Sequence, residues 1–161
     1  MPVSGLLGIR GVVNYEGQAA IEMESLAAQE TGAPAYPLHD MGVVPKAHPA
    51  AIDPAPLVRA IVSDLLAGAR PALIAARFHA SMAALIAAVC GIMARQEHLS
   101  DVCLSGGVFQ NMLLLEQTVD LLAACGLSVH THHQVPANDG SLALGQAVVA
   151  ATMLQRSKGN S

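Results

Sequence analysis

Apolar side chains recur every three or four residues along most of this chain, which is the spacing of amphipathic helices. The pattern predicts helices over residues 16–29, 53–67, 71–96, 108–124 and 141–154. Asp53 and Pro54 supply a cap and a first-turn proline for the second of these helices. Residues 4–13 have the pattern of a helix end that Gly11 terminates, followed by a short extended segment at 12–15.

Shorter apolar runs separate the later helices and predict buried strands at 101–104 and 127–130. Because strands that alternate with helices pair in parallel through right-handed crossovers, we expect these two strands side by side. Residues 35–53 carry prolines and turn-forming clusters, which favour two or three short strands in an antiparallel meander. The predicted fold class is therefore α/β, a mixed sheet with helices on its faces, in a single domain over residues 1–161.

The amino-acid composition argues against some classes of binding partner. The chain is 53% apolar and 12% charged, which argues against disorder, and its net charge of −4 leaves no basic stripe for a nucleic acid. The longest apolar stretch, at 81–93, is too short to span a bilayer, and no signal-peptide pattern begins the chain. Cys90, Cys103 and Cys125 lie in apolar contexts and form no CxxC pair, so we expect buried free thiols in a cytoplasmic protein. Neither a nucleic acid nor a membrane is an expected partner.

The run Leu-Ser-Gly-Gly-Val-Phe-Gln-Asn at 104–111 is the first candidate site. It joins a predicted strand to a helix expected to begin near Val108, a place where backbone N–H groups can meet an anion. Gly106 and Gly107 would let a phosphate or ribose approach the main chain, and Asn111 could reach back toward it. A tight turn without any ligand fits the same spacing equally well.

The run Asn138-Asp139-Gly140 follows the second predicted strand, on the same expected edge of the sheet. Asp139 could ligate a metal there, but an N-cap followed by a turn glycine is the more economical interpretation from sequence chemistry alone. His130, His132 and His133 form an array that could bind zinc or nickel, although exposed loop histidines are favoured.

Three other polar residues stand out. His79 lies on or near the apolar face of a predicted helix, where a hydrogen-bonded core histidine is commoner than a catalytic one. Glu16 and Gln18 flank Gly17 at a helix start, and they suit either a substrate-contacting turn or the ordinary chemistry of a helix terminus.

Four segments together resemble the C-terminal end of the HypF family of hydrogenase-maturation carbamoyltransferases. They are Tyr-Glu-Gly-Gln-Ala-Ala at 15–20, Ile-Ala-Ala-Arg-Phe-His at 74–79, the run at 104–111, and Gln-Val-Pro-Ala-Asn-Asp-Gly-Ser-Leu-Ala-Leu-Gly-Gln-Ala at 134–147. Their order and approximate spacing also match, and the resemblance covers essentially the whole chain. More distantly, the layout is similar to the threonylcarbamoyltransferases that modify tRNA.

The resemblance implies one lobe of an actin-like (ASKHA, ribonuclease-H-like) ATPase fold. It also implies a chemistry in which carbamoyl phosphate and ATP give a carbamoyl-adenylate. The carbamoyl group then passes to the C-terminal cysteine of a HypE-type partner, for the cyanide ligands of nickel–iron hydrogenase.

Residue by residue, Gly106, Gly107 and Asn111 match the family's nucleotide-contacting loop. Asp139 matches an aspartate that helps hold a divalent metal, whereas Glu16, Gln18 and His79 match recurring motifs without an assigned role. The first lobe, with its phosphate loop and a metal-binding histidine pair, has no counterpart in this sequence. The isolated lobe is therefore expected to be inactive, because positioning and charge stabilisation would come from both lobes.

Two alternatives to a lobe of an enzyme stay open. An apolar face that normally packs on the absent first lobe would make the chain an interaction module that self-associates or docks on a partner. A metal binder built on His130, His132 and His133 is the other alternative.

Overall fold

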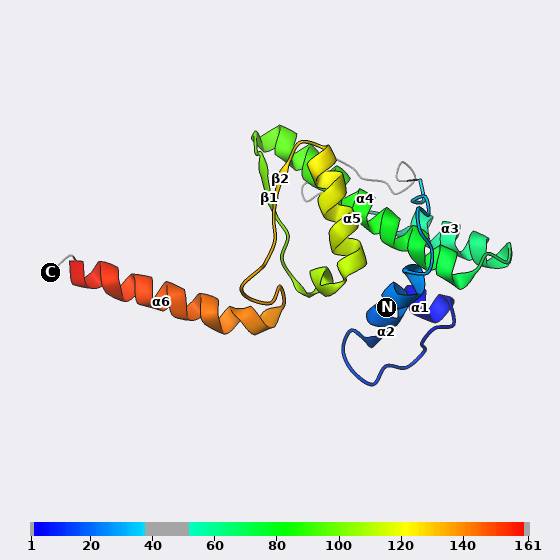
Figure 1. The fold of residues 1–161 in the computed structure, drawn as a ribbon, viewed down its shortest axis with the longest axis horizontal. Helices are drawn as coiled ribbons and strands as arrows, with labels where there is room; N and C mark the ends of the chain where they lie inside the picture. Colours follow the sequence, from blue (N-terminus) through cyan, green and yellow to red (C-terminus); the bar gives the residue numbers. More distant parts are fainter. Residues whose placement is uncertain (1, 38–51, 160–161) are drawn as a thin grey trace.

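The computed structural model describes residues 2–37 and 52–159, and Figure 1 shows their arrangement. The helices are α1 (Pro2–Leu6), α2 (Gln18–Ala27), α3 (Ala55–Leu66), α4 (Pro71–Glu97), α5 (Met112–Ala124) and α6 (Leu142–Gly159). Between them lie the strands β1 (Asp101–Cys103) and β2 (Ser128–His130), and the 3-10 turns η2 (Gly107–Gln110) and η3 (Asp139–Ser141).

Helix α4 organises the fold, since α2, α3 and α5 all pack against it (Figure 1). It begins at Pro71, as the sequence predicts, and ends at Glu97. The next residue, His98, has a φ of 55° and stops the helix. By length and hydropathy this 27-residue helix could cross a membrane, and it is longer than the apolar stretch expected at 81–93. Half of its apolar window is buried inside the protein, however, as in a core helix.

Two apolar cores lie along α4. The first joins α1, α2 and α3 to the beginning of α4, and its largest fully buried side chains are Met23, Ile61 and Ile74. The second lies under the sheet, where Leu104 and Leu122 are buried against Ala87. Both cores use the small alanine side chains of α4, which let neighbouring helices approach closely.

The sheet in the described residues consists of β1 and β2, paired in parallel with Val102 opposite Val129. Those two valines pack on the second core, whereas Asp101, Cys103 and His130 on the other face are exposed. The described sheet is thus parallel and covered on one face, not mixed with helices on both faces. Most of the expected meander at 35–53 lies outside the described residues, and its described ends, 35–37 and 52–53, form no strand.

Several local expectations were wrong. Helix α1 ends at Leu6, and Gly8 rather than Gly11 adopts the left-handed conformation that follows it, with φ 67°. Residues 12–15 form bends rather than an extended segment. The three cysteines are free, as expected, but Cys103 and Cys125 are exposed and Cys90 is half-buried.

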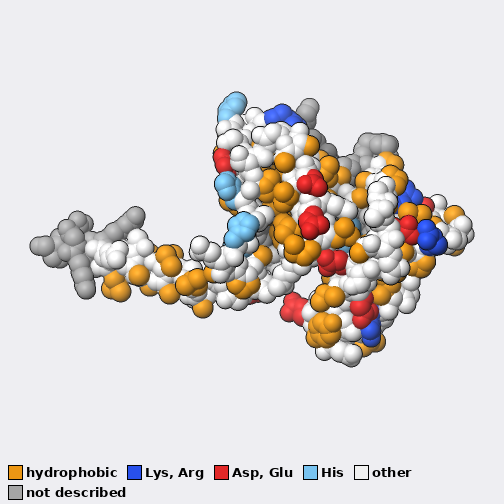
Figure 2. Space-filling model, in the orientation of Figure 1, with side chains coloured by type: hydrophobic (Ala, Val, Ile, Leu, Met, Phe, Trp, Pro, Cys, Tyr) orange, Lys and Arg blue, Asp and Glu red, His pale blue; other side chains and the backbone are white. Residues whose placement is uncertain are grey.

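Helix α6 projects from the rest of the molecule as an arm (Figure 1). Every side chain from Leu142 to Gln155 is exposed, and none of these residues is charged. Figure 2 shows the resulting line of apolar side chains along the arm. The helix predicted at 141–154 therefore forms, but it covers no face of the sheet.

Candidate functional site

The loop after β1 is joined to the loop after β2 by a backbone hydrogen bond. Gly106 has a φ of 104° and donates its N–H to the carbonyl oxygen of Ala137, with 2.8 Å between N and O. An L side chain is strained in that backbone region, so this position requires glycine. A Cβ on Gly107 would lie 3.9 Å from Cβ of Asn138. The two candidate loops therefore form one continuous surface, as the shared sheet edge predicts.

The donors available in this loop differ from those expected. Helix α5 starts at Met112, not near Val108, and Asn111 is its N-cap, whose Oδ1 accepts the Leu114 N–H at 2.8 Å. The Leu113 N–H is donated to Oε1 of Glu24 at 3.1 Å. Two N–H groups in the first turn of α5 are thus already bonded to side chains.

Two N–H groups of the 3-10 turn are left for a ligand. Within residues 2–37 and 52–159, the backbone N–H groups of Gly107 and Val108 have no acceptor. Consecutive N–H groups in a turn make a small anion-binding concavity. The turn before α5 therefore has backbone donors that a ligand could use.

A pocket of about 370 Å³ opens beside this turn, between α2, α4 and the start of α5. It brings together Glu16, His79, Gly107 and Asn111, which the sequence analysis identified in three separate segments. Phe78, Met82 and Leu114 supply much of its apolar wall. Among the residues that the structure describes, no Lys or Arg lines it. Such a mostly apolar pocket with a few convergent polar groups is typical of small-molecule sites.

His79 is 3% exposed and hydrogen-bonded through both ring nitrogens. Its Nδ1 lies 2.8 Å from the carbonyl oxygen of Ala75, and its Nε2 lies 3.0 Å from Nδ2 of Asn111. Burial lowers the pKa of His79, against smaller opposing effects of the Ala75 carbonyl and the Glu24 carboxylate. A neutral, hydrogen-bonded core histidine is therefore what the structure contains, and it lines the pocket as well.

The side chain of Gln18 forms hydrogen bonds with nearby residues. Its side chain is buried, accepts the Asn14 N–H at 2.8 Å and donates to Glu22 at 3.0 Å. Arg10 donates through Nε to the same Glu22 carboxylate, and this bond lowers the carboxyl pKa. Gln18 thus fixes the bend before α2, while Glu16 on the same bend lines the pocket.

Asp139 is exposed at the start of η3, next to the capping residue Asn138. Oδ1 of Asn138 accepts the Gly140 N–H at 3.0 Å, which matches the simpler cap-and-turn interpretation. No group of three or more His, Cys, Asp or Glu that could hold a metal occurs among the described residues. Within the described residues, Asp139 by itself does not supply enough ligands for a metal site.

The three clustered histidines each have a separate hydrogen-bond partner. His130 contacts Asp101 at 2.7 Å, His132 contacts Ser105 at 2.9 Å, and His133 contacts Thr131 at 3.2 Å. All three are exposed, as expected. Since the described residues contain no metal-binding cluster, the structure gives no support to a metal centre in this loop.

Glu24 is a charged pocket residue that sequence reasoning missed. Helical spacing puts it on the polar side of the helix predicted over 16–29. In the structure it is half-buried, lines the pocket and caps α5. Periodicity along α2 gives no signal for this, because the contact depends on where α5 begins.

Comparison with known proteins places the chain in a family. Residues 2–146 match the family model described as "Carbamoyltransferase, Kae1-like Domain, second subdomain". The carbamoyltransferase HypF of Rhodobacter capsulatus is 44% identical over 142 residues, which are 88% of this chain and 17% of that protein. HypF of Synechocystis is 34% identical over 144 residues, 89% of this chain and 18% of its own length.

Solved structures agree with these matches. Full-length HypF in its phosphate- and nucleotide-bound form superposes with a TM-score of 0.85 at 34% identity, over 94% of this chain and 19% of that one. HypF of T. kodakarensis gives a TM-score of 0.75 at 27% identity, over 95% of this chain and 19% of its own. The chain thus spans about a fifth of these relatives. It belongs to the HypF carbamoyltransferase family, as the second subdomain of the Kae1-like domain.

Proposed function

We propose that this chain forms one wall of the nucleotide site of a HypF-type, ATP-dependent carbamoyltransferase. The observation that carries the proposal is the convergence of the Gly106–Gly107 turn, Asn111 and the adjoining pocket on one surface. The similarity to a HypF structure described as phosphate- and nucleotide-bound supports it.

The chemistry of the surface suits a nucleotide. The free N–H groups of Gly107 and Val108 would donate to a phosphate oxygen. The carboxylates of Glu16 and Glu24 are acceptors for the hydroxyl groups of a ribose, and the apolar wall suits a base. ATP thus fits the residues present at its sugar and at one phosphate.

The same surface lacks positive charge for a triphosphate. No Lys or Arg within residues 2–37 and 52–159 lines the pocket, and its two carboxylates repel phosphate groups. Asp139 would contribute one ligand to a divalent metal, and the described residues contain no cluster that would supply the others. We therefore expect weak nucleotide binding by the isolated chain, because the opposite wall of the cleft must supply charge neutralisation.

The proposed reaction is that of the HypF family. Carbamoyl phosphate and ATP form a carbamoyl-adenylate, and the carbamoyl group passes to the C-terminal cysteine of a HypE-type protein in the cytoplasm, for cyanide ligands of nickel–iron hydrogenase. Within an actin-like, two-lobed fold this chain would bind and orient nucleotide. It would not turn over carbamoyl phosphate and ATP alone.

Calorimetric titration with ATP and with AMP tests the assignment. Gly107 has a negative φ and room for a Cβ, so Gly107→Val can fold while its side chain blocks the approach to the turn. Gly107→Val is expected to weaken nucleotide binding at least tenfold. Asp139→Ala is expected to reduce the gain in nucleotide affinity that a divalent metal provides. Gly145→Ala on the exposed arm is the matched control and should bind as the unchanged chain does. Unchanged affinity in both site variants would refute the proposed site.

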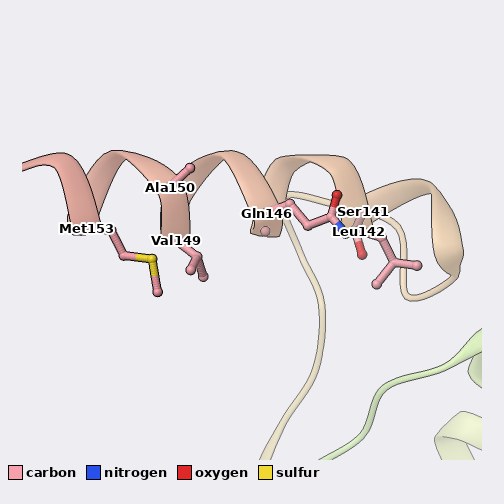
Figure 3. A pocket seen from close by; sticks show the side chains of 7 residues that line it. Ser141, Leu142, Gln146, Val149, Ala150 and Met153 are labelled. Atoms are coloured by element: carbon pink, nitrogen blue, oxygen red, sulfur yellow. The ribbon is translucent and has the colours of Figure 1, made fainter.

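A second candidate function is supported by the exposed arm α6. One side of the arm presents Leu142, Val149 and Met153 around a shallow groove at Gly145 (Figure 3). Every side chain from Leu142 to Gln155 is exposed and uncharged. Such an arm suits an interaction module that docks on a first lobe or on a second copy.

Sedimentation with and without nucleotide separates the two functions. An assembly that nucleotide does not change favours the interaction module. Binding of nucleotide by a monomer favours the enzyme lobe.

A further inference from the structure

His79 has a defined protonation state that follows from its neighbours. The backbone N–H of Leu114 can only donate, so the Asn111 atom that it contacts is the amide oxygen. The other end of that amide is therefore Nδ2, which donates to Nε2 of His79. Nδ1 of His79 faces the Ala75 carbonyl, which can only accept, and so carries the proton. Every donor in this chain of three hydrogen bonds meets an acceptor.

The chain of bonds connects the middle of α4 to the start of α5. Asn111 closes the 3-10 turn, since its N–H is donated to the carbonyl oxygen of Val108 at 3.2 Å. Its own carbonyl oxygen accepts the Leu115 N–H at 3.0 Å. Movement of the Asn111 side chain would therefore disturb both the turn that carries Gly107 and the first turn of α5.

Helix α4 is a rigid support for this purpose. His79 lies between the buried residues Ala76 and Ala83, and the ring of Phe78 packs edge-on against it with 5.9 Å between ring centroids. The first half of the loop is held by the segment after β2, through Gly106 to Ala137 and Ser105 to His132. Its second half is bonded to α4 through Asn111 and His79, so the histidine fixes the end of the loop to that helix.

We propose that His79 is a positioning residue: as a neutral acceptor, it orients the Asn111 amide and thereby holds the Gly107–Val108 donors in place for a phosphate. The part of this inference that concerns phosphate rests on the proposed function. The orientation of Asn111 does not, and it can be measured without any nucleotide.

The first test uses the ligand-free chain. His79→Leu keeps the side-chain volume but removes the acceptor, and should raise the exchange rate of the Leu114 amide about tenfold, the effect of one lost hydrogen bond. Asn111→Ser keeps a capping oxygen but has no N–H to donate, so the ¹⁵N shift of His79 Nε2 should change while Leu114 stays largely protected. His130→Gln, on an exposed histidine outside the pocket, is the control.

The second test measures nucleotide affinity in a double-mutant cycle. Each single variant should bind AMP about tenfold more weakly, and the double variant should lose little more, because both remove the same contact. His79→Gln retains an acceptor on the side chain and should recover part of the affinity.

The outcomes separate the inference from the proposed function. Unchanged Leu114 exchange in His79→Leu, or a protonated Nε2 in the unchanged chain, would overturn the positioning role. Absence of nucleotide binding in all variants, with the ligand-free effects present, would instead refute the proposed function. Should His79→Leu not fold, the ¹⁵N shift in Asn111→Ser decides the question alone.

Discussion

The N–H of Gly106 is donated to the carbonyl oxygen of Ala137 across 2.8 Å, and this bond joins the two loops at the carboxyl edge of the sheet. Without it, the diglycine turn and the Asn138–Asp139 segment would share an edge but not a surface. With it, Gly107 faces Asn138 directly, and Asp139 follows in the chain. A ligand held by one loop would thus lie next to the other.

The first prediction concerns the backbone conformation of Gly106. Its φ of 104° and ψ of 156° belong to a region that is essentially restricted to glycine. Gly106→Ala should therefore destabilise the protein by about 1–3 kcal/mol, measured by urea unfolding. The control Gly145→Ala, inside the exposed helix α6, should instead stabilise it by about 0.5–1 kcal/mol. Equal stability of the two variants would contradict the strain at Gly106.

Tyr36 gives a prediction at alkaline pH. Its side chain is 3% exposed, its hydroxyl donates to Asp64 at 2.7 Å, and the Arg77 guanidinium lies 4.0 Å from the centre of its ring. Burial, reinforced by the Asp64 carboxylate, raises the pKa of Tyr36. Above pH 10 the unfolded chain loses a proton that the folded protein keeps, so the free energy of unfolding falls as pH rises.

Tyr36→Phe isolates this effect. At pH 7 the variant should lose about 1 kcal/mol, because Asp64 loses a donor but keeps its ion pair with Arg77. Between pH 8 and pH 11 the free energy of unfolding, measured with guanidinium, should fall less steeply for this variant than for the unchanged chain. If the free energy of unfolding falls equally with pH in the two proteins, Tyr36 has the same pKa in the folded and the unfolded chain.

His79 gives the opposite dependence at acid pH. Its pKa is lowered in the folded protein, chiefly by burial, while Glu24 on α2 and Glu16 at the pocket rim are the carboxylates that line the same pocket. Below about pH 6.5 the His79 imidazole is protonated in the unfolded chain but stays neutral in the folded chain. The free energy of unfolding therefore falls as pH decreases through this range. Chemical unfolding of His79→Gln between pH 7 and pH 5 should show a shallower loss, and an identical slope would contradict a buried neutral His79.

The sequence predicted the helices best where a local signal marks their ends. Pro71 starts α4 as expected. Helix α3 starts at Ala55, one residue later than expected, with Pro54 at its N-cap and the Asp53 Oδ1 accepting the Ala55 N–H at 2.9 Å. Gly126 ends α5 with φ 78°, again as expected. These ends depend on the chemistry of one or two residues, so the sequence alone determines them.

The start of α5 and the exposure of the sheet were missed for a different reason. Val108 and Phe109 continue the apolar period of the helix, which hides the 3-10 turn, although Asn111 before an apolar run is itself a cap signal. Cys103 has the apolar neighbours of a buried strand, yet its face of the sheet is uncovered. Which face is covered is a tertiary property, and short-range patterns do not contain it.

The exposed arm α6 gives the last prediction. Val149→Glu with Met153→Lys removes the apolar groove and places a Glu four residues before a Lys, a pair that supports a helix by about 0.2–0.5 kcal/mol. If α6 is a docking surface, this variant should sediment as a monomer at concentrations where the unchanged chain assembles, with unaltered unfolding of the rest.

Val12→Glu with Leu66→Lys is the matched control for this arm, because it exchanges two exposed apolar residues for the same charges elsewhere on the surface. A general effect of charge on solubility would act in both double variants. Only a contact made by the arm itself would be lost in the first and kept in the second. Identical sedimentation of the two variants would therefore show that the apolar side of α6 has no part in assembly.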